Sequence, residues 1–484
     1  MAISATFAAL NMDIPCTDSE LQKIRPVAQA ARELGVPCYL VGGFVRDKLL
    51  GRPTKDADFV CVGDALALAQ KAASLFRSSP KVTLFKTFGT AHFRTPDGFD
   101  LEFVGARKES YQRHSRNPVV EPGTLADDQN RRDFTINALA ISLNEADFGT
   151  LVDPFGGRED LKEGLIRTPG EPAITFSDDP LRMMRAIRFA TQLGFRIHPP
   201  TLRAIREQRD RIRIITQERI TDELNKIIAA PKPSVGFKLL FDTKLLDLIF
   251  PQMVDLAGAE FVDGLGHKDN FYHTLQVLDN VAARTNNLWL RWAAILHDIA
   301  KPATKRFEEG HGWTFHGHEV VGGRMVPKIF NAFKLPLGDP MKYVRKLVEL
   351  HLRPISLSKE DITDSAIRRL LFDAGADFDD LMTLCESDIT SKNKAKVQRF
   401  LDNFELVKER CVEVEEKDRI RNWQPPITGE LIMETFGIPP SRAVGDIKDA
   451  IRNAILDGVI PNEYDAAYGF MIQKAAELGL SPVK

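Results

Sequence analysis

The fold is decided by residues 37–62, which read PCYLVGGFVRDKLLGRPTKDADFVCV. The apolar run 37–41 is typical of a short buried strand, the two glycines after it predict a turn, and residues 44–50 predict a helix. Residues 56–62 have the alternation of a second strand. Strand, glycine turn, helix and strand in this order predict a mixed α/β unit.

Two carboxylates stand one residue apart on the second of these strands. Side chains alternate across a strand, so Asp56 and Asp58 project from the same face. This arrangement suits two divalent cations about 4 Å apart, and hard oxygen ligands favour Mg²⁺. A later strand offers a third carboxylate, Asp100 or Glu102; we prefer Glu102, although the pattern alone does not separate them. Solvated turns give the same triplet, so its surroundings decide its meaning.

Those surroundings include Gly42-Gly43, which lies between a strand and a helix. Backbone N–H groups at such a turn, close to a helix N-terminus, are suited to receive phosphates. Arg46 lies in the first turn of the helix and adds positive charge. A phosphate-binding turn beside paired carboxylates indicates a nucleotidyl-transfer site.

Histidines indicate a second site in the helical part of the chain. Six of the ten fall between residues 267 and 318, and His297-Asp298 closes an apolar helical run. Burying several histidines and aspartates without partners costs free energy, so these residues are better explained as metal ligands than as ordinary core residues. His267, His311 and His316 are expected in loops, with His316 as an alternative to His318. The predicted ligands on successive helices are His273, His297, Asp298, His318, His351 and Asp388.

Six motifs resemble the class II tRNA nucleotidyltransferase and bacterial poly(A) polymerase family. They lie in order at residues 40–47, 55–59, 131–138, 153–157, 178–189 and 217–224. The resemblance implies a template-independent nucleotidyltransferase that extends the 3′ end of RNA. One departure is Asp178, where the family usually has Glu.

The resemblance also implies roles for single residues. Asp56 and Asp58 would hold metal, and Gly42, Gly43 and Arg46 would contact the triphosphate. Asp179 and Arg182 would offer a Watson–Crick-like edge to the incoming base, since the Asp can accept from an exocyclic amine and the Arg can donate to ring acceptors. The further nucleotide contacts implied are Arg132, Arg185 and Arg188. The alternative for the arginines of the 178–189 motif is a basic amphipathic helix that supports the neck.

The histidine cluster resembles the HD phosphohydrolase superfamily. His273, His297-Asp298 and Asp388 match its ligands, and His318 and His351 resemble the extra ligands of binuclear members. Imidazole with carboxylate suits Mn, Ni, Fe or Zn ions, and the sequence does not choose among them. The resemblance implies a metal-dependent phosphohydrolase acting on 2′,3′-cyclic or 2′-phosphates.

These observations predict an α/β nucleotidyltransferase head with a mixed sheet, followed by an all-α neck and body, an all-α HD domain and a helical tail. Within the head, residues 18–34 predict a helix that ends at Gly35, and the polar residues 107–130 predict a long mobile loop. The expected boundaries are 1–160 for the head, 161–260 for the neck that binds base and RNA, 261–400 for the HD domain, and 401–484 for a tail that contacts tRNA.

The favoured function is addition of C, C and A to the tRNA 3′ end from CTP and ATP. Poly(A) polymerase and CC-only or A-only enzymes share the head motifs, and an HD phosphohydrolase with a nucleotide- or RNA-binding head is the alternative from another class. The net charge of −2 does not itself indicate a nucleic-acid binder, although arginines cluster locally. Five scattered cysteines and the absence of a long apolar run predict reduced thiols in a cytoplasmic protein without a membrane span. No obligate protein partner is expected, and the oligomeric state is left open.

Overall fold

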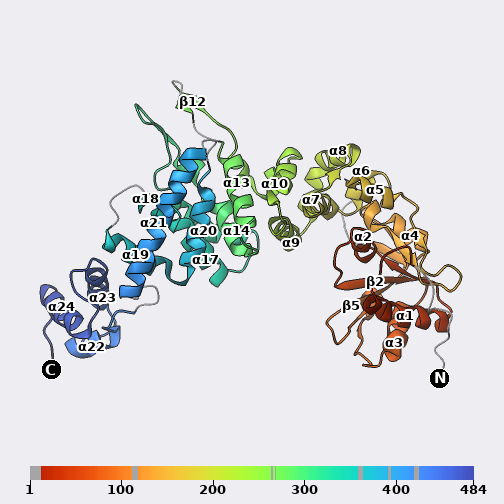
Figure 1. The fold of residues 1–484 in the computed structure, drawn as a ribbon, viewed down its shortest axis with the longest axis horizontal. Helices are drawn as coiled ribbons and strands as arrows, with labels where there is room; N and C mark the ends of the chain where they lie inside the picture. The colour runs from red at the N-terminus through yellow and green to blue at the C-terminus, as the bar shows by residue number, and fades with distance from the viewer. Residues whose placement is uncertain are drawn as a thin grey trace. The chain divides into compact units, whose positions relative to one another are not determined.

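The computed structural model describes residues 12–111, 118–262, 265–266, 269–357, 363–390, 394–418 and 424–483. The chain forms two compact units, Met1–Pro251 and Gln252–Lys484. Figure 1 shows a mixed sheet with its helices near the N-terminus and helices along the rest of the chain. The predicted fold class, an α/β head followed by a mostly helical body with an HD domain, is confirmed.

A seven-stranded sheet organises the head. Its strand order is β3-β4-β5-β2-β1-β8-β9. The pair β2–β5 is parallel, whereas the other pairs of this sheet are antiparallel, so the sheet is mixed as predicted. The strands are β1 Cys38–Val41, β2 Asp56–Cys61, β3 Thr83–Phe85, β4 Thr90–Arg94, β5 Asp100–Gly105, β8 Ala140–Ser142 and β9 Leu151–Val152.

One face of this sheet is covered by helices. Phe59 and Phe103 stack on that face with ring centroids 5.2 Å apart, and Phe93 stacks on Phe103 at 5.4 Å. Helix α3 (Ala65–Leu75) packs on β4 and β5, and α1 (Asp18–Leu34) packs on α3 (Figure 1). As predicted, α1 ends before Gly35, which adopts the left-handed conformation. Because this face is filled with aromatic rings, polar side chains are restricted to the other.

The prediction of one long loop over residues 107–130 is wrong for the part that the structure describes; residues 112–117 lie outside that part. Two strands pair antiparallel there, and a helix follows. Its start is fixed by a capping box, in which Thr124 Oγ1 accepts from the Asp127 backbone N–H and the Asp127 carboxylate accepts from the Thr124 backbone N–H. The polar strands lack the apolar alternation that would have indicated them. The elements are β6 Arg107–Ser110, β7 Val119–Pro122 and α4 Leu125–Asn130.

Helices complete the first unit. A short helix follows the glycine turn of residues 42–43, and another lies at the end of the head. A parallel pair, β10 Leu165–Ile166 with β11 Arg196–Ile197, adds two short strands to the neck. The helices are α2 Gly43–Leu49, α5 Gly157–Glu163, α6 Pro172–Asp178, α7 Leu181–Leu193, α8 Pro199–Gln208, α9 Gln217–Ile228, α10 Pro233–Asp242 and α11 Leu245–Ile249, and α12 Pro251–Val254 begins at the last residue of this unit.

The second unit is a set of packed helices with two short strand pairs. None of its described helices, nor any in the first unit, is both long enough and apolar enough to cross a membrane. The strand pairs are β12 Phe261–Val262 with β13 Leu265–Gly266, and β14 Arg306–Glu308 with β15 Gly312–Thr314. The helices are α13 Asn270–Ala282, α14 Leu288–Leu296, α15 Lys301–Thr304, α16 His318–Ala332, α17 Asp339–Leu350, α18 Arg353–Leu357, α19 Asp364–Ala374, α20 Phe378–Asp388, α21 Lys394–Asp418, α22 Gly429–Phe436, α23 Arg442–Leu456 and α24 Tyr464–Glu477.

Candidate functional site

The predicted carboxylates lie on two adjacent parallel strands. Asp58 on β2 is paired in register with Glu102 on β5, and Asp56 is paired with Asp100. Residues paired across strands share a face, so these carboxylates project from the face that the aromatic core leaves open. Asp58 and Glu102 line one cleft of about 450 Å³. The arrangement places a compact group of acids where a nucleotide can enter.

Crowding of these acids changes the ionisation of the central one. Burial and the neighbouring carboxylates of Glu102 and Asp56 together raise the pKa of Asp58 to about 6, although the charge of Arg132 opposes them. Like charges this close favour a bound cation, and carboxylate oxygens are ligands that Mg²⁺ prefers. The donor set therefore fits divalent metal.

The two candidates for the third carboxylate differ in what they contact. Asp100 accepts from Arg94 Nε at 2.8 Å and Nη2 at 2.7 Å, and its Oδ1 lies 3.1 Å from His92 Nε2. Hydrogen bonds from Arg94 lower the pKa of Asp100. The Glu102 carboxylate forms no hydrogen bond or ion pair within the described residues. The geometry favours Glu102, since its oxygens are the ones left available.

The glycine turn lies directly beside this cleft. Gly42 has φ +74° and ψ −134°, a conformation that side chains disfavour. A Cβ at Gly42 would lie 3.2 Å from Arg132 Nη1 and 3.6 Å from Asp58 Oδ2. Arg46 in α2 is held by Asp47 through Nε at 2.9 Å and Nη2 at 3.0 Å. The turn is therefore narrow, and its arginine is already oriented by the protein.

A basic wall closes the cleft opposite the sheet. Arg131 and Arg132 line it, and both are paired with Asp128, which is buried. Arg132 Nε lies 3.0 Å from Asp128 Oδ2, and Nη1 lies 3.4 Å from the Asn137 carbonyl oxygen. Asp128 was not among the residues predicted from the sequence, although an acid three and four residues before two arginines in a helical turn is a signal for such a pair.

The predicted base-reading pair lies next to this wall. Asp179 follows α6, and its Oδ1 accepts from the Leu181 backbone N–H at 3.2 Å. Arg182 lies in the first turn of α7, and its Nη2 donates to the Arg131 carbonyl oxygen at 2.7 Å. The second Asp179 oxygen and the rest of the Arg182 guanidinium group are the parts that could face a base.

The last two predicted arginines are held by acids. Arg185 contacts Asp133 through Nε at 2.8 Å and Nη2 at 2.6 Å. Arg188 is buried, its Nε donates to Glu223, and its guanidinium carbon lies 4.0 Å from the centre of the Phe189 ring. In this arrangement Arg188 joins α7 to α9. Asp133 and Glu223 were missed, because nothing in the sequence shows which acid meets which arginine.

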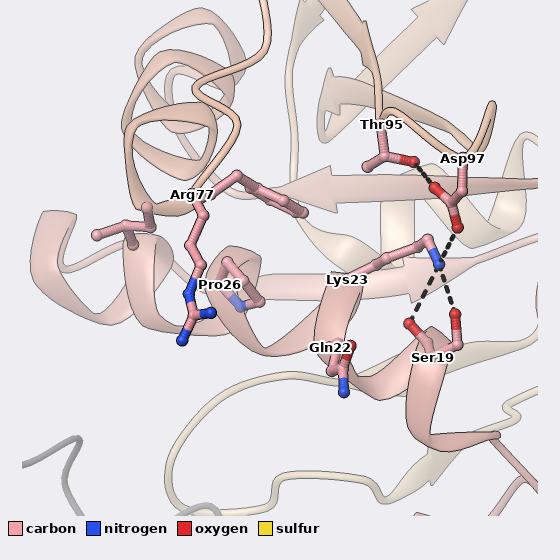
Figure 2. Close-up of a pocket in the computed structure, with 9 residues that line it drawn as sticks. Ser19, Gln22, Lys23, Pro26, Arg77, Thr95 and Asp97 are labelled. Carbon is pink, nitrogen blue, oxygen red and sulfur yellow. Dashed lines mark hydrogen bonds and ion pairs between the residues drawn. The ribbon is translucent and has the colours of Figure 1, made fainter.

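A larger hollow in the head lies away from these residues. It measures about 600 Å³ and lies between α1 and the end of α3. Figure 2 shows Lys23 reaching toward Ser19 and Asp97, with Nζ 2.8 Å from Ser19 Oγ and 2.8 Å from Asp97 Oδ2. A third contact, to the Ser19 carbonyl oxygen at 3.3 Å, completes the three donors of Lys23. The Lys23 ammonium group is therefore already paired within the protein and is not available to a ligand of this hollow.

The second unit brings the predicted histidine–aspartate ligands together in two adjoining groups. His273, His297 and Asp388 form one group, and Asp298, His318 and His351 form the other. The ligand atoms within each group lie within 4.8 Å of one another. Asp298 connects the groups, because its Oδ2 lies 3.2 Å from His297 Nε2 and its Oδ1 lies 3.2 Å from His318 Nε2.

Each of the four rings in these groups is oriented through its Nδ1 atom. The Nδ1 atoms of His297, His318 and His351 lie 2.7, 2.8 and 2.7 Å from backbone carbonyl oxygens. His273 Nδ1 lies 2.9 Å from Thr390 Oγ1. A proton on Nδ1 directs the Nε2 lone pair into the cluster, which is the arrangement of metal-binding imidazoles. The His297 Nε2 atom is buried and has no well-formed hydrogen bond, so it is available as a ligand atom, and the donor set fits a metal ion.

Two histidines of this cluster differ strongly in pKa. Although burial opposes it, the carboxylates of Asp298 and Asp388 raise the pKa of His297 to about 10. Burial lowers the pKa of His351 to about 4. Lys301 Nζ lies 2.6 Å from Asp298 Oδ2. The positive charges of Lys301 and of the His297 ring therefore both lie next to the Asp298 carboxylate.

The remaining histidines lie apart from the cluster. His316 is 83% exposed and lies 3.7 Å from Glu308, so His318 and not His316 joins the cluster. His311 is exposed and follows the β14 strand. His267 lies outside the described residues.

Three family descriptions match the chain. "Poly A polymerase head domain" matches residues 38–167, "Probable RNA and SrmB-binding site of polymerase A" matches 194–256, and "HD domain" matches 270–374. The first contains the carboxylate cleft, and the third contains every histidine of the second cluster.

Relatives with known names share most of the chain. It is 31% identical to an A-adding tRNA nucleotidyltransferase of Deinococcus radiodurans over 438 residues, which cover 88% of this chain and 93% of that protein. It is 36% identical to a multifunctional CCA protein of Pseudomonas fluorescens, over 62% of this chain and 70% of that protein. Its fold resembles the Bacillus stearothermophilus CCA-adding enzyme in complex with CTP, with a TM-score of 0.65 and 24% identity over 96% of this chain and 99% of that one.

Proposed function

We propose that this chain, which belongs to the tRNA nucleotidyltransferase family, completes the CCA end of tRNA from CTP and ATP without a nucleic-acid template. Membership of this family makes the chain a nucleotidyltransferase. The observation that carries the proposal is the acidic group Asp56, Asp58 and Glu102 beside the Gly42 turn. The family includes an A-adding enzyme and multifunctional CCA proteins, so an experiment must decide which nucleotides this chain adds.

In this proposal the open face of the sheet holds the reacting groups. Asp56, Asp58 and Glu102 would hold Mg²⁺ ions, which supply activation of the attacking 3′-hydroxyl and stabilisation of the leaving pyrophosphate. The backbone at Gly42 and Gly43 binds the triphosphate, and a side chain at Gly42 would narrow the turn, since its Cβ would lie 3.2 Å from Arg132 Nη1. Arg132 lies beside the Gly42 turn, where its charge can offset that of a phosphate.

Base selection in this proposal belongs to Asp179 and Arg182. The Asp179 carboxylate accepts from the amino group that cytosine and adenine share, and the Arg182 fork donates to ring acceptors. Uracil and guanine lack an amine at that place, so they leave Asp179 unpaired, which is costly in a closed pocket. Arg185, held by Asp133, fixes the helix from which Arg182 projects.

The decisive experiment uses two tRNA substrates, one that lacks CCA and one that ends in CC, each with labelled CTP or ATP. A CCA-adding enzyme adds C to the first and A to the second. Addition of A to the second substrate only is the second candidate, which is favoured by the Deinococcus relative. Long tails from ATP alone would contradict both and would favour a poly(A) polymerase.

A separate phosphoester hydrolysis is proposed for the second unit. The six ligands in two groups joined by Asp298 support it. They suit a transition metal such as Mn, Ni, Fe or Zn, which would supply an activated water for 2′,3′-cyclic or 2′-phosphate esters. His297→Ala with Asp298→Ala should remove hydrolysis and spare tRNA extension, and Asp56→Ala should do the reverse. Wild-type extension by Asp56→Ala would overturn the carboxylate assignment.

A further inference from the structure

An exposed aromatic turn lies beside the carboxylate cleft. Residues 85–89 read FKTFG, and the side chains of Phe85 and Phe88 are 46% and 73% exposed. The 3₁₀ turn Lys86–Phe88 connects β3 to β4, and Gly89 ends it in the left-handed conformation at φ +61°. Neither phenylalanine ring stacks on another aromatic ring within the described residues. Exposing two large apolar rings to water is unfavourable, so their position beside the carboxylate cleft suggests that they bind a ligand.

The sheet register directs Phe85 toward the acids. Phe85 is paired with Thr90, and Thr90 is paired with Val104, which lies two residues after Glu102 on β5. Paired residues and residues two apart share one face, so Phe85 and Glu102 project on the same side of the sheet. Both line the cleft of about 450 Å³. Phe85 is therefore a wall of the catalytic cleft and not a remote surface residue.

Strand order places this wall opposite the triphosphate turn. In the order β3-β4-β5-β2-β1, Gly42 follows β1 on one side of the acidic strands and Phe85 ends β3 on the other. An in-line displacement needs the attacking oxygen and the leaving group on opposite sides of the reacting phosphorus. If the triphosphate occupies the Gly42 side, the RNA primer approaches from the Phe85 side.

Phe88 extends the wall into a neighbouring hollow of about 260 Å³. The two hollows share Val104 and Arg107, so they adjoin. Lys86 follows Phe85 at the start of this turn and is exposed, and its side chain has no hydrogen bond or ion pair in the part of the chain that the structure describes. Aromatic rings interleaved with cations in a groove suit single-stranded nucleic acid, because bases stack on the rings while the cations meet phosphates.

We propose that Phe85 and Phe88 form a stacking platform for the 3′-terminal bases of the RNA primer, with Lys86 contacting the phosphate between them. The proposal rests on the proposed function, since only an RNA-extending enzyme brings a primer end to this cleft. Because every base has a flat face, the platform would hold the changing terminal residue, first one base and then another, without sequence readout. Phe85 and Phe88 are thus positioning residues for the primer and take no part in the chemistry.

The test compares Phe85→Leu and Phe88→Leu, which keep apolar bulk but lose the flat ring, with Phe85→Trp, which restores a ring. Each leucine variant should raise the KM for tRNA by roughly 5- to 150-fold, as expected for loss of one stacked base. The KM for the nucleotide should stay within about twofold, and the tryptophan variant should recover the tRNA KM. Leu34→Ala, which changes another exposed apolar residue of the head, is the matched control and should change neither constant.

A second readout does not depend on extension. An RNA primer with 2-aminopurine as its 3′-terminal base, added without nucleotide, should lose fluorescence when it stacks on the wild-type protein. The quenching should disappear in Phe85→Leu at saturating protein and return in Phe85→Trp. Unchanged quenching in both leucine variants, or a rise in nucleotide KM in place of tRNA KM, would overturn the platform. If the wild type quenches the probe but extends no RNA, the proposed function fails and the platform stands.

Discussion

Replacing Asp133 by asparagine removes the acid that holds Arg185. Burial would raise the pKa of Asp133, but the charge of Arg185 and a hydrogen bond from Asn137 lower it to about 2. Against an unfolded pKa of about 3.9, this shift of roughly two pKa units corresponds to about 2.6 kcal/mol of unfolding free energy at neutral pH. Asp133→Asn should therefore destabilise the head by about 2–4 kcal/mol, because it also leaves Arg185 without its counter-charge.

The pH dependence of this loss has a definite sign. Because the folded pKa of Asp133 lies below the unfolded one, its stabilisation is complete well above pH 4 and is lost as the pH falls through 2. At pH 3 about half of it remains, so the difference in unfolding free energy between wild type and Asp133→Asn should shrink by about 1 kcal/mol from pH 7 to pH 3. Urea unfolding at both values measures this difference.

The placement of tryptophan provides an internal control for that assay. The four tryptophans, Trp289, Trp292, Trp313 and Trp423, all belong to the second unit. Their fluorescence transition should not move in Asp133→Asn, whereas the far-UV circular dichroism transition of the head should.

A surface acid gives the matched control for the same experiment. Asp222→Asn removes the exposed partner of Lys226 and should cost about 0–1 kcal/mol. If Asp133→Asn costs no more than Asp222→Asn, or if its cost does not depend on pH, the reasoning about the buried pair is refuted.

Three further outcomes are expected. Glu102→Gln should lower kcat for tRNA extension by about 100-fold or more. Asp100→Asn should lower kcat less than tenfold, since the Asp100 carboxylate is held by Arg94, and equal losses in the two variants would contradict the choice of Glu102. Gly42→Ala should raise the KM for the nucleotide and cost about 1–2 kcal/mol of stability at φ +74°, which calorimetry and steady-state kinetics can check together. His318→Ala should reduce the transition metal that copurifies, measured by elemental analysis, whereas His316→Ala should leave it unchanged; loss of metal in both would mean that exposure does not separate the two histidines.

Much of the head could be predicted because its signals are local. The strand periodicity placed Asp56 and Asp58 on one face, and the Gly42 turn needed only the residues on either side of it. The choice between Asp100 and Glu102 could not be made from the sequence, because both lie on the same face of β5. It depends on Arg94, which lies on the neighbouring strand and reaches Asp100 across the ladder.

The arginines of α7 show a limit of another kind. Their spacing predicted one charged helix with several nucleotide contacts. In the structure, Arg185 and Arg188 are turned toward Asp133 and Glu223, residues that are 52 and 35 positions away in the chain. Charge periodicity says which side chains share a helix face, but which acid meets which arginine depends on how helices pack. The strands β6 and β7 could not be predicted for a related reason, since they are polar, pair with each other and bury no apolar stripe.

The second cluster could be predicted although its ligands lie on, or directly after, five separate helices, and the reason is energetic. A single inward-facing histidine can be satisfied by one carbonyl, but here His297, His318 and His351 use their Nδ1 atoms in that way and still direct Nε2 toward carboxylates. Without a cation, two buried aspartates this close to four imidazole rings favour protonation of one of the rings. The pKa of His297, which is raised to about 10 by these aspartates, agrees with this expectation. A metal ion would relieve the same charge imbalance, and its binding should therefore release a proton from the cluster at neutral pH. Titration of the metal-free protein with Zn²⁺ or Mn²⁺ in two buffers of different ionisation enthalpy should detect that proton, and binding enthalpies that do not depend on the buffer would show that His297 is neutral before the metal arrives.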